Sequence, residues 1–179
     1  MHGIDLNSLT LARYIPSEID LLHQIVAECG EDMKRRYGLT HWTPPYPIET
    51  MRKNANELQV FGVHLGNEVL GTFTVGTHGW KDDSQFWANP KHNPLYLGKL
   101  AVRPMYQGYG IGGWCIRKVE EMAHEWDCQT IRFDAIAQHA NLILFYRNLG
   151  YSERGTQRIC DWCGREWEIM YLEKVLTSY

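Results

Sequence analysis

The sequence has little net charge of either sign and no long hydrophobic run. Its 18 Lys and Arg residues nearly balance 21 Asp and Glu residues, which leaves a net charge of -3 at pH 7. So small a charge creates no general attraction for nucleic acid or for an anionic membrane, and we expect neither as a partner. No run of about 20 apolar residues occurs, so no membrane-spanning helix is expected. Met1–Ser8 also lacks the basic flank and apolar core of a signal peptide, and we expect a cytoplasmic protein.

The cysteine pattern does not form a disulfide framework. There are five cysteines, an odd number, and Cys29, Cys115 and Cys128 stand singly, which is typical of reduced thiols. Cys160 and Cys163 form a CxxC pair, but a structural zinc site needs four ligands, and no second pair or HxxxH follows. We therefore expect no metal.

Length and composition are those of an ordinary globular protein. The chain has 179 residues, of which 44% are hydrophobic and 22% are charged. This length suits one domain with a buried core, and the composition argues against disorder or a fibrous repeat. We expect a single domain over residues 1–179.

Hydrophobic periodicity predicts both strands and helices. Alternation or short apolar runs favour strands at Leu9–Ile15, Leu58–Leu65, Val69–Val75, Leu95–Val102, Gln129–Ala137, Tyr151–Cys160 and Glu166–Val175. Helical spacing favours a helix that opens at Pro16 and further helices over Ile48–Asn56, Ile111–Trp126 and Ala140–Leu149. In the fifth strand, Ile131 and Phe133 alternate with Arg132 and Asp134, which indicates one apolar and one polar face.

Two segments between these elements are expected to be shaped loops. Tyr37–Pro47 holds three prolines, Trp42 and Tyr46, and therefore cannot be helix interior. Trp80–Pro94 is a long polar and aromatic excursion, and long loops of this kind often carry function.

A glycine-rich loop joins the strand that ends at Val102 to the helix that begins at Ile111. The first N–H groups of a helix have no partner within it and lie at the positive end of its dipole, so they can surround a phosphate. Gly108, Gly110 and Gly112 can adopt conformations closed to other residues and present their N–H groups to a diphosphate. The segment therefore predicts an anion site.

A dinucleotide site is an alternative interpretation of the same glycines. Gly108, Gly110 and Gly113 satisfy GxGxxG, and Asp134 follows about 20 residues later, as that motif asks. Against it, five residues separate Val102 from Gly108, and the 66 residues after Gly113 (179 minus 113) end in an apparent hairpin. A doubly wound sheet needs repeated strand-helix units instead. No Gly-Lys-Ser or Gly-Lys-Thr exists, so a P-loop is excluded.

Two motifs resemble those of the GNAT superfamily of N-acyltransferases. Gln107-x-x-Gly110-x-Gly112, preceded by Leu100-Ala101-Val102-x-Pro104, is similar to the family's coenzyme A signature. Downstream, Phe145-Tyr146-Arg147-Asn148-Leu149-Gly150-Tyr151 is similar to the family's second conserved segment. The resemblance covers Leu95–Tyr151. It implies an α/β fold with a mixed sheet of about seven strands and four helices, in which Leu95–Val102 and Gln129–Ala137 are parallel neighbours that splay apart at the cofactor site.

The resemblance also implies a cofactor and a set of site residues. The cofactor is acetyl-CoA, which acts as a co-substrate, and the catalytic acid is Tyr146, which protonates the leaving thiolate. Where the family often has an asparagine that contacts the pantetheine arm, this sequence has His139, and the nearest asparagine is Asn141. The implied cofactor-binding residues are Leu100, Ala101, Val102, Gln107, Gly108, Tyr109, Gly110, Ile111, Gly112, Gly113, Phe145, Arg147 and either His139 or Asn141.

The expected acceptor is a primary amine of a small molecule or peptide. In this fold its pocket would include Trp42, Tyr46, His78 and Trp80, while the catalytic base stays open among Glu31, Asp32, His41, His78, Asp82 and Asp134. A domain that binds acyl-CoA as a sensor without turnover is the main alternative, and a dinucleotide-binding oxidoreductase is the second. The chain is expected to be a monomer or a homodimer.

Overall fold

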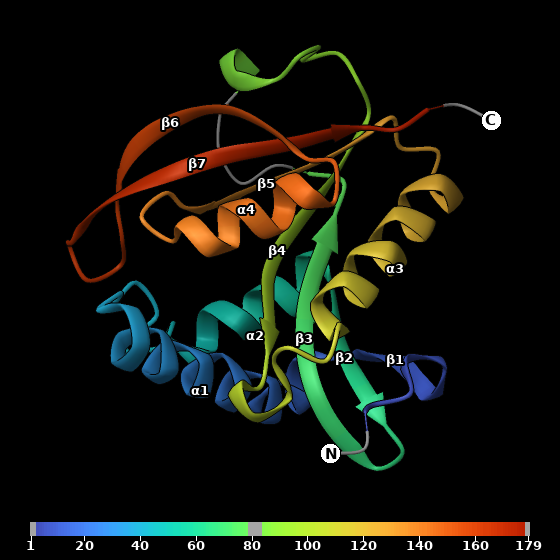
Figure 1. Ribbon diagram of the computed structural model, residues 1–179, viewed down its shortest axis with the longest axis vertical. Helices are drawn as coiled ribbons and strands as arrows, with labels where there is room; N and C mark the ends of the chain where they lie inside the picture. Colours follow the sequence, from blue (N-terminus) through green and yellow to red (C-terminus); the bar gives the residue numbers. More distant parts are fainter. Residues whose placement is uncertain (1–2, 79–83, 178–179) are drawn as a thin grey trace. The chain divides into compact units, whose positions relative to one another are not determined.

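The computed structural model describes residues 3–78 and 84–177. These residues form a seven-stranded mixed sheet, in the order β1-β2-β3-β4-β5-β7-β6, and four α-helices (Figure 1). The predicted α/β fold is confirmed. The chain packs as two compact units, Met1–Val75 with Lys99–Lys118 and Gly76–Gly98 with Val119–Tyr179. The single domain over residues 1–179 stays a prediction.

The observed elements follow the predicted ones closely. The strands are β1 Leu9–Tyr14, β2 Gln59–Leu65, β3 Glu68–Gly76, β4 Pro94–Val102, β5 Thr130–Ile136, β6 Ser152–Cys160 and β7 Glu166–Val175. The helices are α1 Asp20–Tyr37, α2 Ile48–Glu57, α3 Ile111–Glu125 and α4 Ala140–Asn148. The main difference concerns the first helix, which was predicted to open at Pro16. Pro16–Glu18 instead form a separate 3-10 turn before α1. None of the helices in the described part of the chain is long and apolar enough to cross a membrane.

The first unit is built on an antiparallel meander of β1, β2 and β3. The turn between β2 and β3 uses Gly66 at a φ of +58°, a conformation that glycine adopts without steric cost. The main-chain N–H of Arg103 donates to the carbonyl oxygen of Leu70 at 2.8 Å, which ties the end of β4 to β3. The apolar stripes of α1 and α2 pack on these strands in one core: Ile19, Leu22, Ile25, Val26, Cys29, Met51, Ala55, Val60, Val69 and Ala101.

One close backbone contact positions the loop after α1. Gly30 is buried in α1, and a Cβ atom placed there would lie 2.4 Å from the carbonyl oxygen of Trp42. Only glycine leaves room for the loop to approach the helix so closely. Gly30 therefore sets where Trp42 lies.

We predict that Gly30→Ala destabilises the protein. The overlap with a backbone oxygen should lower the free energy of unfolding by about 1–3 kcal/mol, although alanine favours a helix by about 1 kcal/mol. Urea denaturation measures the change. Gly3→Ala is the matched control, because nothing lies within 4 Å of its added Cβ atom. A Gly30→Ala protein as stable as the wild type would contradict the contact.

The second unit contains the parallel pair of the sheet. The β4–β5 ladder joins Pro94–Tyr96 to Thr130–Arg132, and Leu97 and Gly98, the next residues of β4 in this unit, lie beyond its last pair. The expected parallel pairing of these strands is confirmed. β5 continues antiparallel with β7, and β7 pairs with β6 in a hairpin whose turn has Gly164 at a φ of +77°.

A buried ion pair crosses β5 and β7. Arg132 is only 2% exposed and its Nε lies 3.0 Å from Oε1 of the fully buried Glu173. The same carboxylate accepts a hydrogen bond from the main-chain N–H of Ala88 at 2.9 Å, and Arg132 donates to the carbonyl oxygen of Asn89 at 2.7 Å. The expectation of a polar face at Arg132 was wrong, because the residues around Ala88 cover it. These bonds anchor the end of the excursion between β3 and β4.

We predict that Arg132→Met lowers the free energy of unfolding by about 3–5 kcal/mol, because the buried Glu173 loses one of its two guanidinium partners and keeps only Arg154. The matched control is Arg52→Met, which removes the surface pairs to Asp20 and Glu49 and should lower it by about 1 kcal/mol or less. Chemical denaturation of both variants checks the contrast. Equal losses would show that burial does not govern the Arg132 pair.

The CxxC pair lies at the turn of the β6–β7 hairpin. Cys160 and Cys163 are exposed free thiols, whereas Cys29, Cys115 and Cys128 are buried. Between the pair, Asp161 organises the turn. Burial would raise the pKa of this carboxyl, but hydrogen bonds from the main chain and side chain of Arg165, from Trp167 and from the main chain of Cys163 lower it to about 2.

Candidate functional site

The glycine-rich loop between β4 and α3 has the backbone shape of an anion cradle. Gly108 and Gly110 have φ values of +85° and +84°, so both adopt the left-handed conformation that favours glycine. The carbonyl oxygen of Gly110 accepts the first hydrogen bond of α3, from the main-chain N–H of Trp114 at 3.0 Å. The N–H groups of Ile111, Gly112 and Gly113 therefore fall in the first helical turn, where no intrahelical partner exists.

The space beside the loop is open at Gly108 and Gly113 but tighter at Gly110, where an added Cβ atom would lie 3.3 Å from Leu6 Cδ1. A Cβ atom at Gly108 would meet nothing within 4 Å, and one at Gly113 would meet only the end of Arg117 at 3.8 Å. Gly112 lies inside α3 and does not have a positive φ, so the expectation of an unusual backbone conformation there was wrong. The N–H groups of the first turn and the openness of the loop together suit a phosphate group.

Side chains of α1 hold the strand end and the cradle in place. The amide of Gln107 donates to the carbonyl oxygen of Val102 at 3.0 Å and accepts a hydrogen bond from Arg36 Nη1 at 3.1 Å. The same Arg36 nitrogen lies 3.2 Å from Oδ2 of Asp32, which is buried and also binds Arg35. Gln107 was predicted to bind the cofactor. Its side chain holds the glycine-rich loop through the bonds to Val102 and Arg36.

A buried thiol makes a second contact with the same carbonyl. Cys29 Sγ donates to the carbonyl oxygen of Val102 at 3.1 Å. Burial, followed by the charges of Glu28 and Asp32, raises the pKa of the Cys29 thiol to about 12, so it stays protonated and can donate. Cys29 and Arg36 were not predicted as site residues, because their positions along α1 indicate only a helix.

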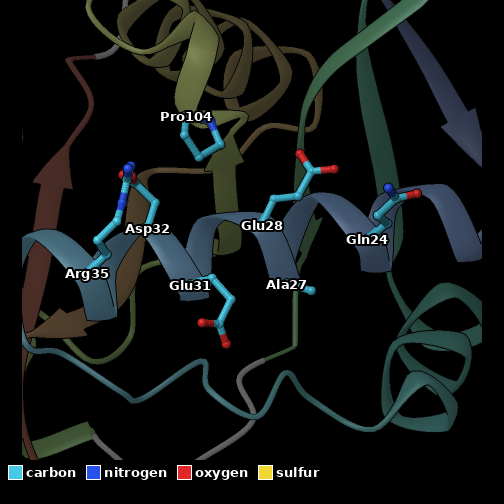
Figure 2. A pocket seen from close by; sticks show the side chains of 7 residues that line it. All are labelled: Gln24, Ala27, Glu28, Glu31, Asp32, Arg35 and Pro104. Atoms are coloured by element: carbon cyan, nitrogen blue, oxygen red, sulfur yellow. The ribbon is translucent and has the colours of Figure 1, made fainter.

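An open pocket of about 580 Å³ lies along α1 beside the start of the cradle. Its lining residues are Gln24, Ala27, Glu28, Glu31, Asp32, Arg35 and Pro104. Figure 2 shows Glu28 and Asp32 pointing from α1 toward Pro104, while Glu31 points the other way. Since Asp32 is held between two arginines, its carboxylate serves as a structural acceptor, and of the candidate bases in this pocket Glu31 is the exposed one.

The first unit also positions two of the residues predicted to line the acceptor pocket. Trp42 and Tyr46 are half-buried and pack against the core of α1 and α2. His23 Nε2 lies 2.7 Å from the carbonyl oxygen of Tyr46, so the loop is attached to α1 at this point as well as at Gly30. The candidate base His41 is half-buried on the same loop, with its ring centroid 5.5 Å from that of Trp42.

The second unit carries the predicted acid, Tyr146, on α4. This tyrosine is 5% exposed and lies in an aromatic cluster, with ring-centroid distances of 4.5 Å to Phe133, 5.0 Å to Phe145 and 6.1 Å to Tyr151. Its main-chain oxygen accepts from the N–H groups of Leu149 and Tyr151. The ring is thus held in one orientation, which a proton donor requires.

The other predicted cofactor residues of this unit lie at the two ends of α4. His139 is the N-cap of the helix, and its Nδ1 accepts from the main-chain N–H of Leu142 at 3.3 Å. Asn141 is exposed, and Arg147 is exposed with its Nε 3.4 Å from Glu153. His139 therefore has a structural task that Asn141 does not share.

The remaining predicted residues lie between β3 and β4 or on β5. His78 is exposed and its Nδ1 lies 3.4 Å from the hydroxyl of Thr77. Asp134 is half-buried on β5 opposite Tyr171 of β7. Trp80 and Asp82 lie outside the described residues. Within the parts that the structure describes, no group of three or more His, Cys, Asp or Glu side chains is arranged to hold a metal ion.

A known protein family matches most of the chain. The family model of GNAT acetyltransferases matches residues 22–151, which include the cradle, β5, α4 and Tyr146. The chain belongs to the GNAT acetyltransferase family. The resemblance noted in its two motifs is confirmed.

Solved structures of GNAT proteins share the fold of the chain at low sequence identity. The GCN5-related N-acetyltransferase from Rhodopseudomonas palustris is 15% identical, with a TM-score of 0.72 over 98% of this chain and 99% of that chain. The ribosomal-protein-S18-alanine N-acetyltransferase from Escherichia coli is also 15% identical, with a TM-score of 0.70 over 96% of each chain. A putative acetyltransferase from Salmonella typhimurium, solved with its cofactor acetyl-CoA, is 13% identical, with a TM-score of 0.66 over 97% of this chain and 96% of that chain.

Relatives found by sequence match shorter stretches. An uncharacterized N-acetyltransferase of Bacillus subtilis is 32% identical over 74 residues, which are 41% of each chain. The thialysine N-epsilon-acetyltransferase of Sus scrofa is 34% identical over 56 residues, which are 31% of this chain and 33% of the relative. The chain thus spans less than half the length of these two relatives.

We predict that Gly110→Leu weakens the binding of coenzyme A, because a side chain strains the left-handed backbone and closes the cradle. The dissociation constant, measured by calorimetry, should rise about 10-fold or more. Gly66→Leu is the matched control, since it places the same strain in a hairpin outside the cradle. Unchanged affinity in Gly110→Leu would remove the proposed site.

Proposed function

We propose that this GNAT protein is an N-acetyltransferase that moves the acetyl group of acetyl-CoA to a primary amine of a small molecule or peptide. The observation that carries the proposal is the cradle at the start of α3, where the left-handed Gly108 and Gly110 precede first-turn N–H groups that have no intrahelical partner. Such a cradle suits the diphosphate of coenzyme A. The solved GNAT structures from Salmonella typhimurium and Elizabethkingia anophelis that were determined with acetyl-CoA support the same donor.

The proposed cofactor contacts divide between the two units. In the first, N–H groups from Gln107 to Gly113 hold the diphosphate, and the backbone of Leu100–Val102 holds the pantetheine arm through its amides. In the second, Asn141 is the residue proposed for the cofactor, since His139 is engaged as the cap of α4. Arg147 supplies a cation for a phosphate group, and the ring of Phe145 contacts the cofactor beside Tyr146.

Acetyl-CoA supplies a reactive thioester, and the residues of the chain supply orientation and proton transfer. The acceptor amine must be neutral to attack, so an alkylammonium with a pKa near 10 first loses a proton to a base or to water. The amine nitrogen then forms a bond to the acetyl carbonyl carbon, releases its extra proton to solvent, and the carbon–sulfur bond breaks. A main-chain N–H of Leu100–Val102 stabilises the negative charge on the carbonyl oxygen. Tyr146 donates its phenolic proton to the departing sulfur and regains one from solvent.

Two named proteins support an amine as the acceptor. One relative is a thialysine N-epsilon-acetyltransferase, and one structural neighbour is a ribosomal-protein-S18-alanine N-acetyltransferase. Both names describe transfer to an amino nitrogen. These names support the proposal of a primary amine on a small molecule or a peptide.

The two alternatives differ from this proposal in ways that experiments can separate. A sensor that binds acyl-CoA without turnover would keep the cradle but would not need the phenol of Tyr146. A dinucleotide-binding oxidoreductase is disfavoured by the strand pairs, because β1–β2, β2–β3, β5–β7 and β6–β7 are all antiparallel. A doubly wound sheet has mostly parallel strands.

We predict that the protein releases free thiol from acetyl-CoA in the presence of a panel of primary amines, and that Tyr146→Phe lowers kcat about 100-fold by removing the proton donor. The affinity for acetyl-CoA, measured by calorimetry, should stay near the wild-type value, because the ring remains in its aromatic cluster. A coupled thiol-release assay measures turnover.

Tyr14→Phe is the matched control, because Tyr14 is a partly buried tyrosine on β1 whose hydroxyl contacts His64. It should leave kcat within about twofold of the wild type. Acetyl-CoA binding without thiol release for any amine would favour the sensor. Full turnover by Tyr146→Phe would remove the tyrosine from the mechanism while leaving the cradle in place.

A further inference from the structure

The CxxC pair, Cys160 and Cys163, is a motif that the proposed function does not use. Cys160 is the last residue of β6, opposite Glu166 of β7, and Cys163 lies in the turn that joins the two strands. Both are exposed free thiols, whereas the other cysteines of the chain are buried. The turn therefore presents two thiols to solvent, with the spacing that forms half of a structural zinc site.

Hydrogen bonds to one aspartate fix the backbone between the two thiols. Asp161 Oδ1 accepts from the main-chain N–H groups of Cys163 at 2.8 Å and Arg165 at 3.0 Å, and Oδ2 accepts from the indole N–H of Trp167 at 2.8 Å. The main-chain N–H of Gly164 donates to the carbonyl oxygen of Asp161 at 3.0 Å. Because these bonds close the turn on their own, the backbone of both cysteines is ordered before an ion binds, and little entropy is lost on binding.

One chain supplies only part of the ligand set that zinc requires. The carboxylate of Asp161 is 6% exposed and pairs with the guanidinium of Arg165 at 2.8 Å, so it is engaged inside the turn. Within residues 3–78 and 84–177, no group of three or more His, Cys, Asp or Glu side chains is arranged to hold a metal ion. A structural zinc site has four ligands in a tetrahedron, and the two thiols of this turn are half of that number. An identical pair on a second copy of the chain supplies the other half.

We propose that Cys160 and Cys163 form half of a zinc site that a second copy of the chain completes. Two hairpin turns, related by a twofold axis through the ion, hold one Zn²⁺ through four thiolates, and each thiol releases its proton on binding. The turn lies at the free end of the β6–β7 hairpin, and β6 is the last strand in the order of the described sheet (Figure 1). The thiols of two copies can therefore approach one ion. The sequence-based expectation of no metal counted the ligands of a single chain.

The test titrates Zn²⁺, and Co²⁺ as a spectroscopic probe, into the untagged protein. A chelator first removes bound metal, and a phosphine keeps the thiols reduced. Binding should saturate at one ion per two chains, and Co²⁺ should show the thiolate charge-transfer and visible bands of a tetrahedral ion with sulfur ligands. Coenzyme A is left out, because its own thiol would compete for the metal.

Sedimentation measures the assembly at a dilution where the metal-free chain is a monomer. Zinc should double the mass, and addition of a chelator should reverse the change. Cys160→Ser and Cys163→Ser should each weaken zinc binding by about 100-fold or more and abolish the doubling. Both changes are at exposed positions, so circular dichroism should show an unchanged fold.

Cys128→Ser is the matched control. It alters a buried thiol of the same unit, whose bond to the carbonyl oxygen of Trp126 at 3.7 Å a hydroxyl can keep. This variant should bind zinc and double in mass as the wild type does.

The outcomes do not depend on acetyl transfer, because neither cysteine belongs to the residues proposed for the cofactor, the acceptor or the proton transfer. Absence of zinc binding, or binding that both serine variants retain, would overturn the thiolate site. Saturation at one ion per chain with an unchanged mass would overturn the role of the second copy.

Discussion

The position of the glycine cradle depends on the hydrogen bonds that α1 makes to the end of β4. The carbonyl oxygen of Val102 accepts from the thiol of Cys29 and from the amide of Gln107, and Arg36 links that amide to the buried Asp32. A loop with two left-handed glycines has many accessible conformations. These contacts restrict it to one, so the N–H groups of α3 are arranged before any ligand arrives. Pre-arranged donors of this kind bind an anion without a large loss of entropy.

In the first unit, a close backbone contact also positions the loop after α1. Gly30 lets the loop after α1 reach the helix, and His23 holds the same loop at Tyr46. The ring of Tyr46 in turn contacts the ammonium of Lys99 on β4. The same helix, α1, therefore braces the proposed donor site through one part of its length and the residues predicted to line the acceptor pocket through another.

A buried ion pair holds the strands of the second unit together. Arg132 and Glu173 join β5 to β7, and each also binds the main chain of the segment at Ala88–Asn89. Aromatic rings add to this anchor, since Phe86 stacks on Tyr171 with ring centroids 4.2 Å apart. The rings and the ion pair hold the segment onto the strands of this unit. Tyr146, on α4, is oriented separately by the rings of Phe133, Phe145 and Tyr151.

The sequence by itself determined the strands, the helices, the glycine loop and the family. Those features depend on residues close together in the chain: the period of apolar residues, the turn at Gly66, and the spacing from Gln107 to Gly113. The two family motifs are also continuous segments, so they can be recognised without coordinates.

Only the tertiary structure decided which side chains brace the cradle and which line its surroundings. Arg36 and Gln107 are 71 positions apart, and Arg132 and Glu173 are 41 apart, so no local pattern connects them. The burial of Arg132 was missed because the alternation in β5 describes one strand, whereas the segment at Ala88 covers its second face. Lys99 on β4 has a φ of +49°, a left-handed conformation that local preference disfavours for a non-glycine residue, so the sequence gives no sign of it.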